Sequence, residues 1–382
     1  MGHKMVNKFA VLTMLVGACA LSPSAHPPLW LRAQLVEATH SQDFSHQNFE
    51  HADMKNTGLS ELLFANSRFL QADFSNSKIS GVNFHVAYMQ RANFTNARFD
   101  KVDFTGADLR GASLRGAIFQ DSILKAADLR GADLTDCRFI RVDASVARLD
   151  GLDLTTTTFD TVQLDDAFMI AARLERTDLA TTRLRRANLQ NANLKGARLS
   201  GVDLFKADLS GANLDEADFS GANLNVADLS KAIGAHAHFA NAQMIGAKLR
   251  GAHLTHADFR ASELREATLV ESILPNANFS DANLELSDAS WSQWHNAQMH
   301  KAHMSRVNFK RADLLGLNAS EAEFRWADFG QANLKNALFF GAQMHKADVR
   351  GADIEGADFR GATYMDYVIG LHLAKNIELA RF

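Results

Sequence analysis

The sequence has 382 residues but contains only two cysteines and four prolines. Two cysteines exclude a disulfide-rich scaffold and a zinc site with four cysteine ligands. The scarcity of proline excludes collagen-like and proline-rich chains. An excess of one sign of charge is also absent, because 40 lysines and arginines stand against 44 aspartates and glutamates. This balance excludes a polybasic nucleic-acid binder, and the hydrophobic content of 47% excludes a disordered polar chain.

Long hydrophobic runs are missing as well, since no apolar stretch reaches the roughly 18 residues of a transmembrane helix. A shorter run, Phe9–Ala20, follows Lys4 and Lys8 near the start of the chain. A basic segment before a short apolar run is typical of a secretory signal peptide. The sequence therefore predicts an export signal over residues 1–20 and a periplasmic or outer-membrane location.

Two cleavage sites compete in this segment. The run Ala18-Cys19-Ala20 fits a cleavage site with small flanking residues. The run Val16-Gly17-Ala18-Cys19 resembles a bacterial lipobox, and this resemblance implies that Cys19 is lipidated and anchors the mature protein to a membrane. The alternative is that Cys19 is an ordinary apolar residue of a discarded peptide.

A period of five dominates the rest of the chain. With four exceptions, a large apolar residue stands at every fifth position from Phe44 to Tyr364, which makes 65 consecutive pentapeptides in one register. A small residue often stands two positions earlier, and Asp or Asn often stands immediately before the large residue. Neither a helix nor an alternating strand has this period. A short unit that cannot bury its own apolar residue predicts a solenoid.

The unit Ala-(Asp/Asn)-(Leu/Phe)-x-x, as in residues 212–221, resembles the pentapeptide-repeat family. The resemblance implies an all-β fold, a right-handed quadrilateral β-helix with four pentapeptides per coil and therefore roughly 16 coils. The expected organisation is a signal over 1–20, a linker and N-terminal cap over 21–43, the β-helix over 44–364 and a C-terminal cap over 365–382. Because solenoid ends expose strand edges, we expect short helical caps at both ends.

The residue chemistry agrees with a narrow four-sided tube. Seventeen of the 23 glycines stand two positions after the large residue, which suits a corner with positive φ. Asp and Asn before the large residue can accept hydrogen bonds from backbone amides at that corner, so these acids have a structural explanation.

A few units depart from the rule, with Ala289 and Gly234 at large positions. We expect volume compensation, for example by Trp294, although a local bend that marks a binding surface is the alternative.

Motifs for catalysis are missing, so we expect no enzyme, no catalytic residue and no cofactor. One column of residues spaced by 20 suggests a metal site. Glu216, His236 and His256 are spaced by 20 residues and would stack on adjacent coils, where they could bind Zn²⁺ or Ni²⁺. The alternative interpretation is a solvated column of polar side chains.

Certain pentapeptide-repeat proteins mimic DNA and bind type II topoisomerases, so the resemblance implies gyrase protection as an alternative function. Mimicry requires a long acidic face, whereas columns of residues 20 apart mix acidic, basic and apolar side chains. We therefore expect a non-enzymatic, exported scaffold or protein-interaction rod of the bacterial envelope, and no nucleic-acid partner. The expected partners are an unknown envelope protein and a second copy of the chain bound through the C-terminal cap. Exposed aromatic residues such as Trp291, Trp326 and Phe205 would contact the partner.

Overall fold

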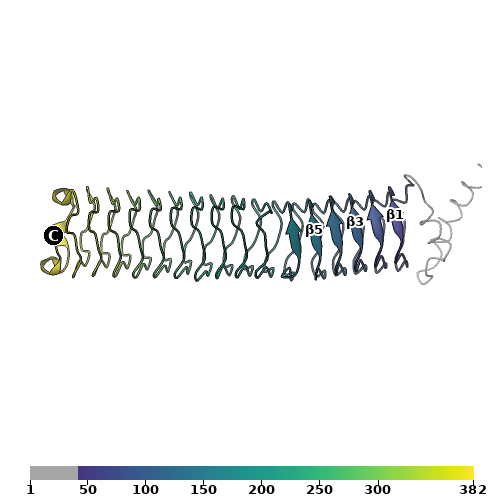
Figure 1. Ribbon diagram of the computed structural model, residues 1–382, viewed down its shortest axis with the longest axis horizontal. Coiled ribbons are helices and arrows are strands. Elements are labelled where there is room, and N and C mark those ends of the chain that lie inside the picture. Colours follow the sequence, from purple (N-terminus) through teal and green to yellow (C-terminus); the bar gives the residue numbers. More distant parts are fainter. Residues whose placement is uncertain (1–41) are drawn as a thin grey trace, which may run out of the picture. The chain divides into compact units, whose positions relative to one another are not determined.

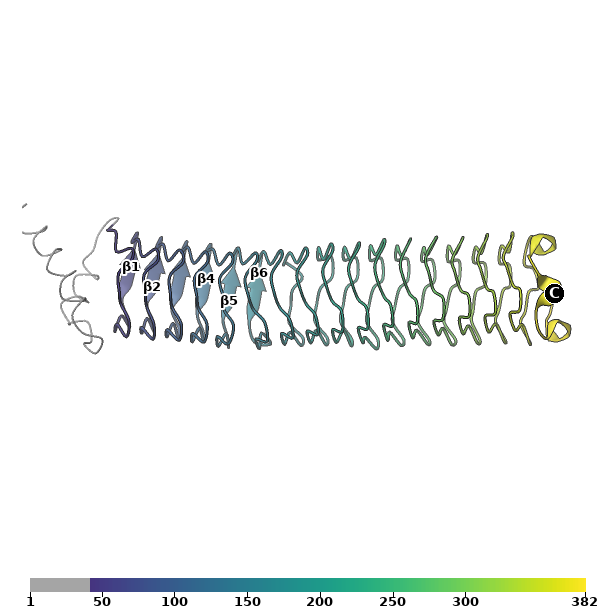
Figure 2. The same ribbon diagram turned by 180° about the vertical axis from the view of Figure 1, so that it is seen from behind.

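The computed structural model describes residues 42–382, which form two compact units. Residues 42–147 belong to the first unit and residues 148–382 to the second. Each unit is an all-β parallel solenoid whose coils stack one on another (Figures 1 and 2). The predicted signal over 1–20, Cys19 and nearly all of the predicted N-terminal cap lie outside the described residues. No helix within residues 42–382 is long and apolar enough to cross a membrane.

Four pentapeptides make one coil, because ladder partners lie 20 residues apart on each of four sides. In the first unit the four sides are represented by the pairs Leu63–Asn83, Arg68–Tyr88, Asp73–Asn93 and Lys78–Arg98. One side of this unit is regular enough to form strands, which pair in parallel in the order of the chain: β1 (Gly58–Ser60), β2 (Lys78–Ser80), β3 (Arg98–Asp100), β4 (Ile118–Gln120) and β5 (Arg138–Ile140). The second unit contains β6 (Thr158–Asp160).

Each corner is a β-turn built from the repeat itself. The amide of the small residue donates to the carbonyl of the preceding large residue, as Ala72 N does to Phe69 O at 3.0 Å. The second of the two residues between them has a positive φ, +56° at Gln71 and +67° at Gly111. This confirms the left-handed corner that the glycine positions predict. Residues other than glycine also adopt this left-handed conformation at many corners, and asparagine does so with the least strain.

The large and small residues of the repeat fill the interior. Phenylalanines 20 residues apart stack along the axis, with ring centres 5.2 Å apart for Phe84 and Phe104 and 4.4 Å apart for Phe259 and Phe279. Cys137 occupies a small position and is fully buried, and this burial raises the pKa of its thiol well above the usual range. A thiol without accessible thiolate is chemically inert, so Cys137 serves packing.

The irregular units remain closely packed. A methyl group added at Gly234 would lie 2.8 Å from Leu254 Cδ2, so the neighbouring coil already occupies the space of the missing side chain. Trp294 is fully buried in the same coil as Ala289. Its indole N–H donates to Ser292 Oγ at 2.5 Å, and the Ser292 hydroxyl donates to the Ala289 carbonyl. These contacts favour volume compensation over a bend.

The segment after Tyr364 continues the coil with six residues per side instead of five. Its ladder pairs are Asp348–Ile369, Asp353–Lys375 and Asp358–Arg381, which are 21, 22 and 23 residues apart. Each added residue is accommodated in a 3₁₀ turn: η1 (Met365–Tyr367), η2 (Leu371–Leu373) and η3 (Ile377–Leu379), yellow in Figure 1. The predicted C-terminal cap is therefore a widened last turn of the solenoid, closed by Phe382 stacked on Phe359 at 5.5 Å.

Candidate interaction surfaces

The outer wall holds many acidic side chains, and most of them serve the backbone. The carboxylate or amide oxygen before the large residue accepts the amide hydrogen two residues later, as Asp218 Oδ1 does from Ser220 N at 2.9 Å. The same contact joins Asp208 to Ser210 N at 3.0 Å. Such bonds satisfy amides at the end of each side that would otherwise face solvent. The repeated acids are thus corner supports, as their position in the repeat predicts.

Five of these acids are also held by an arginine two residues later. Each pair is bidentate or nearly so, as in Arg110, whose Nε and Nη2 donate to the two Asp108 oxygens at 2.8 and 2.6 Å. The pairs are Asp108–Arg110, Asp128–Arg130, Asp258–Arg260, Asp348–Arg350 and Asp358–Arg360. Burial alone raises the pKa of Asp108, but hydrogen bonds from the Arg110 side chain and backbone outweigh it and lower the pKa. Hydrogen bonds from the side chain and backbone of Arg360 lower the pKa of Asp358 to about 2.

These pairs make stability depend on pH in the acidic range. A carboxyl whose pKa is lower in the folded than in the unfolded chain stabilises the fold above the unfolded pKa of about 3.9. That contribution is lost as pH falls through the folded pKa, so we expect the unfolding temperature to decrease between about pH 4 and pH 2. Circular dichroism melts from pH 6 to pH 2 measure this decrease, and a constant unfolding temperature would contradict it.

A matched pair of variants separates the arginine contacts from net charge. Arg110→Gln with Arg130→Gln removes two of the pairs, and we expect a smaller decrease of the unfolding temperature between pH 4 and pH 2. Arg91→Gln with Lys125→Gln changes the net charge equally, although neither residue belongs to a salt bridge within residues 42–382. This control should keep the pH profile of the unmodified protein.

The predicted histidine ladder is brought together in part. The rings of His236 and His256 stack with centres 4.9 Å apart and planes 4° apart. Glu216 instead pairs with Lys195, at 3.7 Å between Oε1 and Nζ. Within the described part of the chain, no group of three His, Cys, Asp or Glu side chains is placed to hold a metal ion. Metal binding by Glu216, His236 and His256 therefore stays a prediction.

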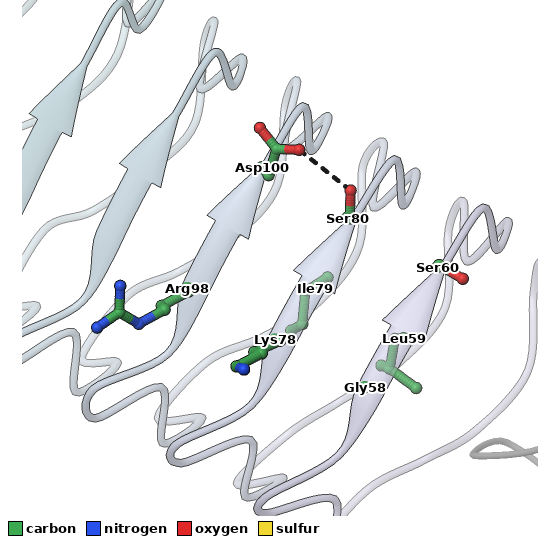
Figure 3. A pocket seen from close by; sticks show the side chains of 8 residues that line it. All are labelled: Gly58, Leu59, Ser60, Lys78, Ile79, Ser80, Arg98 and Asp100. Carbon is green, nitrogen blue, oxygen red and sulfur yellow. Dashed lines mark hydrogen bonds between the residues drawn. The ribbon is translucent and has the colours of Figure 1, made fainter.

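A shallow groove of about 450 Å³ crosses β1, β2 and β3 of the first unit (Figure 3). Lys78 and Arg98 extend at one end of the strands, and Ser60, Ser80 and Asp100 lie at the other end. Ser80 Oγ donates to Asp100 Oδ2 at 3.2 Å. The pentapeptide pattern alone does not predict this groove. The signal was available, because reading every twentieth residue from Gly58 within the first unit gives Lys78, Arg98, Ile118 and Arg138.

Exposed aromatic side chains gather near the end of the second unit. Trp326 is 50% exposed, with Lys346 Nζ 4.2 Å from its ring centre. His345 lies between Trp326 and Tyr367, with ring centres 6.3 and 5.1 Å away. The last turn adds more exposed apolar side chains: Tyr364, Leu373, Leu379 and Phe382, each more than half exposed. Of the other predicted contacts, Trp291 is exposed beside Arg311, whereas Phe205 is half-buried beneath Arg185 and Lys206.

The family model of pentapeptide repeats matches most of this chain, over residues 59–160, 169–251 and 262–361. The chain belongs to the pentapeptide-repeat family. No curated protein matches it. Among solved pentapeptide-repeat structures it is similar to HetL of the cyanobacterium Nostoc sp. strain PCC 7120, a protein involved in heterocyst differentiation regulation. That likeness has 26% identity, a TM-score of 0.26, and covers 64% of this chain and 92% of HetL.

Two further pentapeptide-repeat structures resemble parts of the chain. QnrB1, a plasmid-mediated fluoroquinolone resistance protein, is 21% identical with a TM-score of 0.33, over 56% of this chain and 90% of QnrB1. A pentapeptide-repeat protein from the Arabidopsis thaliana thylakoid lumen is 38% identical with a TM-score of 0.20, over 27% of this chain and 70% of its own. The family assignment rests on the repeat match, and it agrees with the corner and ladder geometry above.

Proposed function

We propose that this pentapeptide-repeat chain is a non-enzymatic, exported scaffold of the bacterial envelope that binds protein partners through the end of its second unit. The observation that carries the proposal is the group of aromatic and apolar side chains exposed on the last turn, including Tyr367 at 57% and Leu379 at 53%. Contiguous exposed apolar surface is unfavourable in water and typical of protein interfaces. A rigid solenoid wall loses little conformational entropy when it binds.

The partner that suits this end best is a second copy of the same chain. Within residues 42–382, Ile369, Lys375 and Arg381 each have a ladder partner on one side, so the backbone groups of their other side and the exposed apolar side chains of the last turn can both contact a partner. A twofold axis would bring two such ends together and bury identical surfaces against each other. Export rests on the apolar run after Lys8, and attachment to a membrane rests on lipidation of Cys19.

One preparation tests both parts. The full-length gene is expressed in a Gram-negative host, and the product is fractionated and measured by intact mass and by light scattering. We expect a mature N-terminus at acylated Cys19 in the membrane fraction and a dimer in detergent. A product that begins at Met1 in the cytoplasm would overturn the envelope function, and a monomer would overturn the end-to-end contact.

Two double variants distinguish the specific dimer contact from non-specific hydrophobic association. Leu373→Ser with Leu379→Ser should convert the dimer into a monomer that keeps its unfolding temperature. Ile233→Ser with Leu286→Ser changes two other exposed apolar residues and should leave the dimer intact. Loss of the dimer in both variants would contradict the assignment to the last turn.

The charges of the outer wall give less support to the alternative function, in which the chain mimics DNA. A mimic needs rows of free carboxylates, whereas Asp108, Asp258 and Asp348 are each held by an arginine. At these pairs the arginine places positive charge beside the acid and weakens the negative field that a mimic requires.

A further inference from the structure

Three cationic side chains stand in one row on the strand side of the first unit. The parallel register places Lys78 beside Arg98, Arg98 beside Ile118, and Ile118 beside Arg138. All three cations are exposed, and no salt bridge within residues 42–382 includes any of them. Adjacent strands lie about 4.8 Å apart, so Lys78 and Arg98 present neighbouring positive charges along the solenoid axis, and Arg138 adds a third beyond Ile118.

Arg98 forms no salt bridge within residues 42–382, although the sequence places a carboxylate two residues later at Asp100. Arg148 and Asp150 have the same sequence spacing as Arg98 and Asp100, and they form a salt bridge of 3.2 Å. Asp100 instead accepts the hydroxyl hydrogen of Ser80, and Figure 3 shows Arg98 extending at the opposite end of the strand. The guanidinium of Arg98 and the ammonium of Lys78 therefore border the groove with their hydrogen-bond donors available.

We propose that this row and the adjoining groove bind a linear acidic polysaccharide, a polymer that carries carboxylate or sulfate groups. Charge complementarity argues for an anion, and repetition along the axis argues for a polymer rather than a single ion. Arginine and lysine donate charge-assisted hydrogen bonds to such oxyanions. The hydroxyls of Ser60 and Ser80 on the other side of the groove are suited to sugar hydroxyls.

The lining also selects against other polyanions. Single-stranded nucleic acid is usually held by aromatic side chains that stack on its bases, and no aromatic side chain lines this groove. Asp100 lies in the groove and repels anions, so the polymer would follow the Lys78–Arg98 edge rather than the centre. The nearby Arg141 is bound to Asp121, with Nε–Oδ1 at 2.6 Å, and adds little attraction.

Biolayer interferometry of the full-length protein with immobilised polymers tests the proposal. The probes are heparin for sulfate, polygalacturonate for carboxylate, dextran as the neutral polymer and oligo-dT as the nucleic acid. We expect binding to at least one acidic polysaccharide, weakened by added salt, and weaker binding to dextran and oligo-dT. Tighter binding to oligo-dT, or equal binding to dextran, would overturn the proposal, as would no binding at low salt.

Substitutions locate the site. Lys78→Gln with Arg98→Gln should weaken binding at least tenfold, with an unchanged circular dichroism spectrum and unfolding temperature. Arg91→Gln with Lys125→Gln removes two other cations without salt bridges from the same unit and should change affinity less than twofold. Equal losses in both variants would show attraction to net charge alone and would overturn the assignment to the groove.

Discussion

Replacement of Leu214 by aspartate is expected to unfold, at neutral pH, the coil of the second unit that contains this residue. Leu214 is completely buried among apolar side chains, and an ionised carboxylate there has no water and no partner. The resulting cost of several kcal/mol is comparable to the whole stability of a typical domain, about 5–15 kcal/mol. Because each coil of a solenoid is stabilised by its neighbours, the defect should spread to the adjacent coils.

Aspartate introduced on the outer wall provides the control. Ser200 is half-exposed and stands two residues after Arg198, so Ser200→Asp should change the free energy of unfolding by no more than about 0.5 kcal/mol. Urea unfolding followed by circular dichroism compares the two variants. Similar losses at Leu214 and Ser200 would contradict the assignment of inward and outward positions.

Trp294 is expected to give the second large effect. Its replacement by alanine removes a fully buried indole that contacts Phe279 and Phe309, and it should cost about 3–5 kcal/mol. Leucine at the neighbouring Ala289 should cost about 1–3 kcal/mol alone, because it overfills the coil. If Trp294 fills the space that Ala289 leaves, the double variant should be more stable than the sum of the two losses by about 0.5–3 kcal/mol.

Urea denaturation of the single variants and the double variant completes this cycle. Strictly additive losses would show that the two positions do not share one space, and the compensation would then be wrong. Ser292→Ala is a useful companion, since it leaves the Trp294 N–H without its acceptor and should cost about 1–3 kcal/mol. Ser272→Ala is its control, because Ser272 occupies the same place in the repeat and bonds only to the Leu269 carbonyl.

The period of five was sufficient to predict the coil, the buried positions and the positive φ of the corners. These features follow from one repeated steric requirement, so every pentapeptide of the sequence indicates the same coil geometry. The last turn was predicted only as a cap because its period of six spans just three sides. The signal was present in the equivalent residues Met365, Leu371 and Ile377, each six apart.

Side-chain partners were less predictable than positions. The spacing of 20 placed His236 beside His256, and the rings do stack, but it did not reveal that Glu216 pairs with Lys195. Nor could spacing alone show that Arg98 lacks the partner that Arg148 has. These choices depend on rotamers and on competing donors such as Ser80, which a repeat pattern does not encode.

The widened last turn has a consequence for growth into fibres. The last turn pairs with the preceding pentapeptide coil because each added residue lies in a 3₁₀ turn, and an incoming chain that tried to extend the solenoid would have to accommodate these three turns. We expect these turns to disfavour open-ended head-to-tail polymerisation, although several apolar side chains of the last turn are exposed. A closed pair related by twofold symmetry avoids this requirement, because both surfaces have the same perimeter. We therefore expect the three added residues to disfavour a filament while allowing a closed pair.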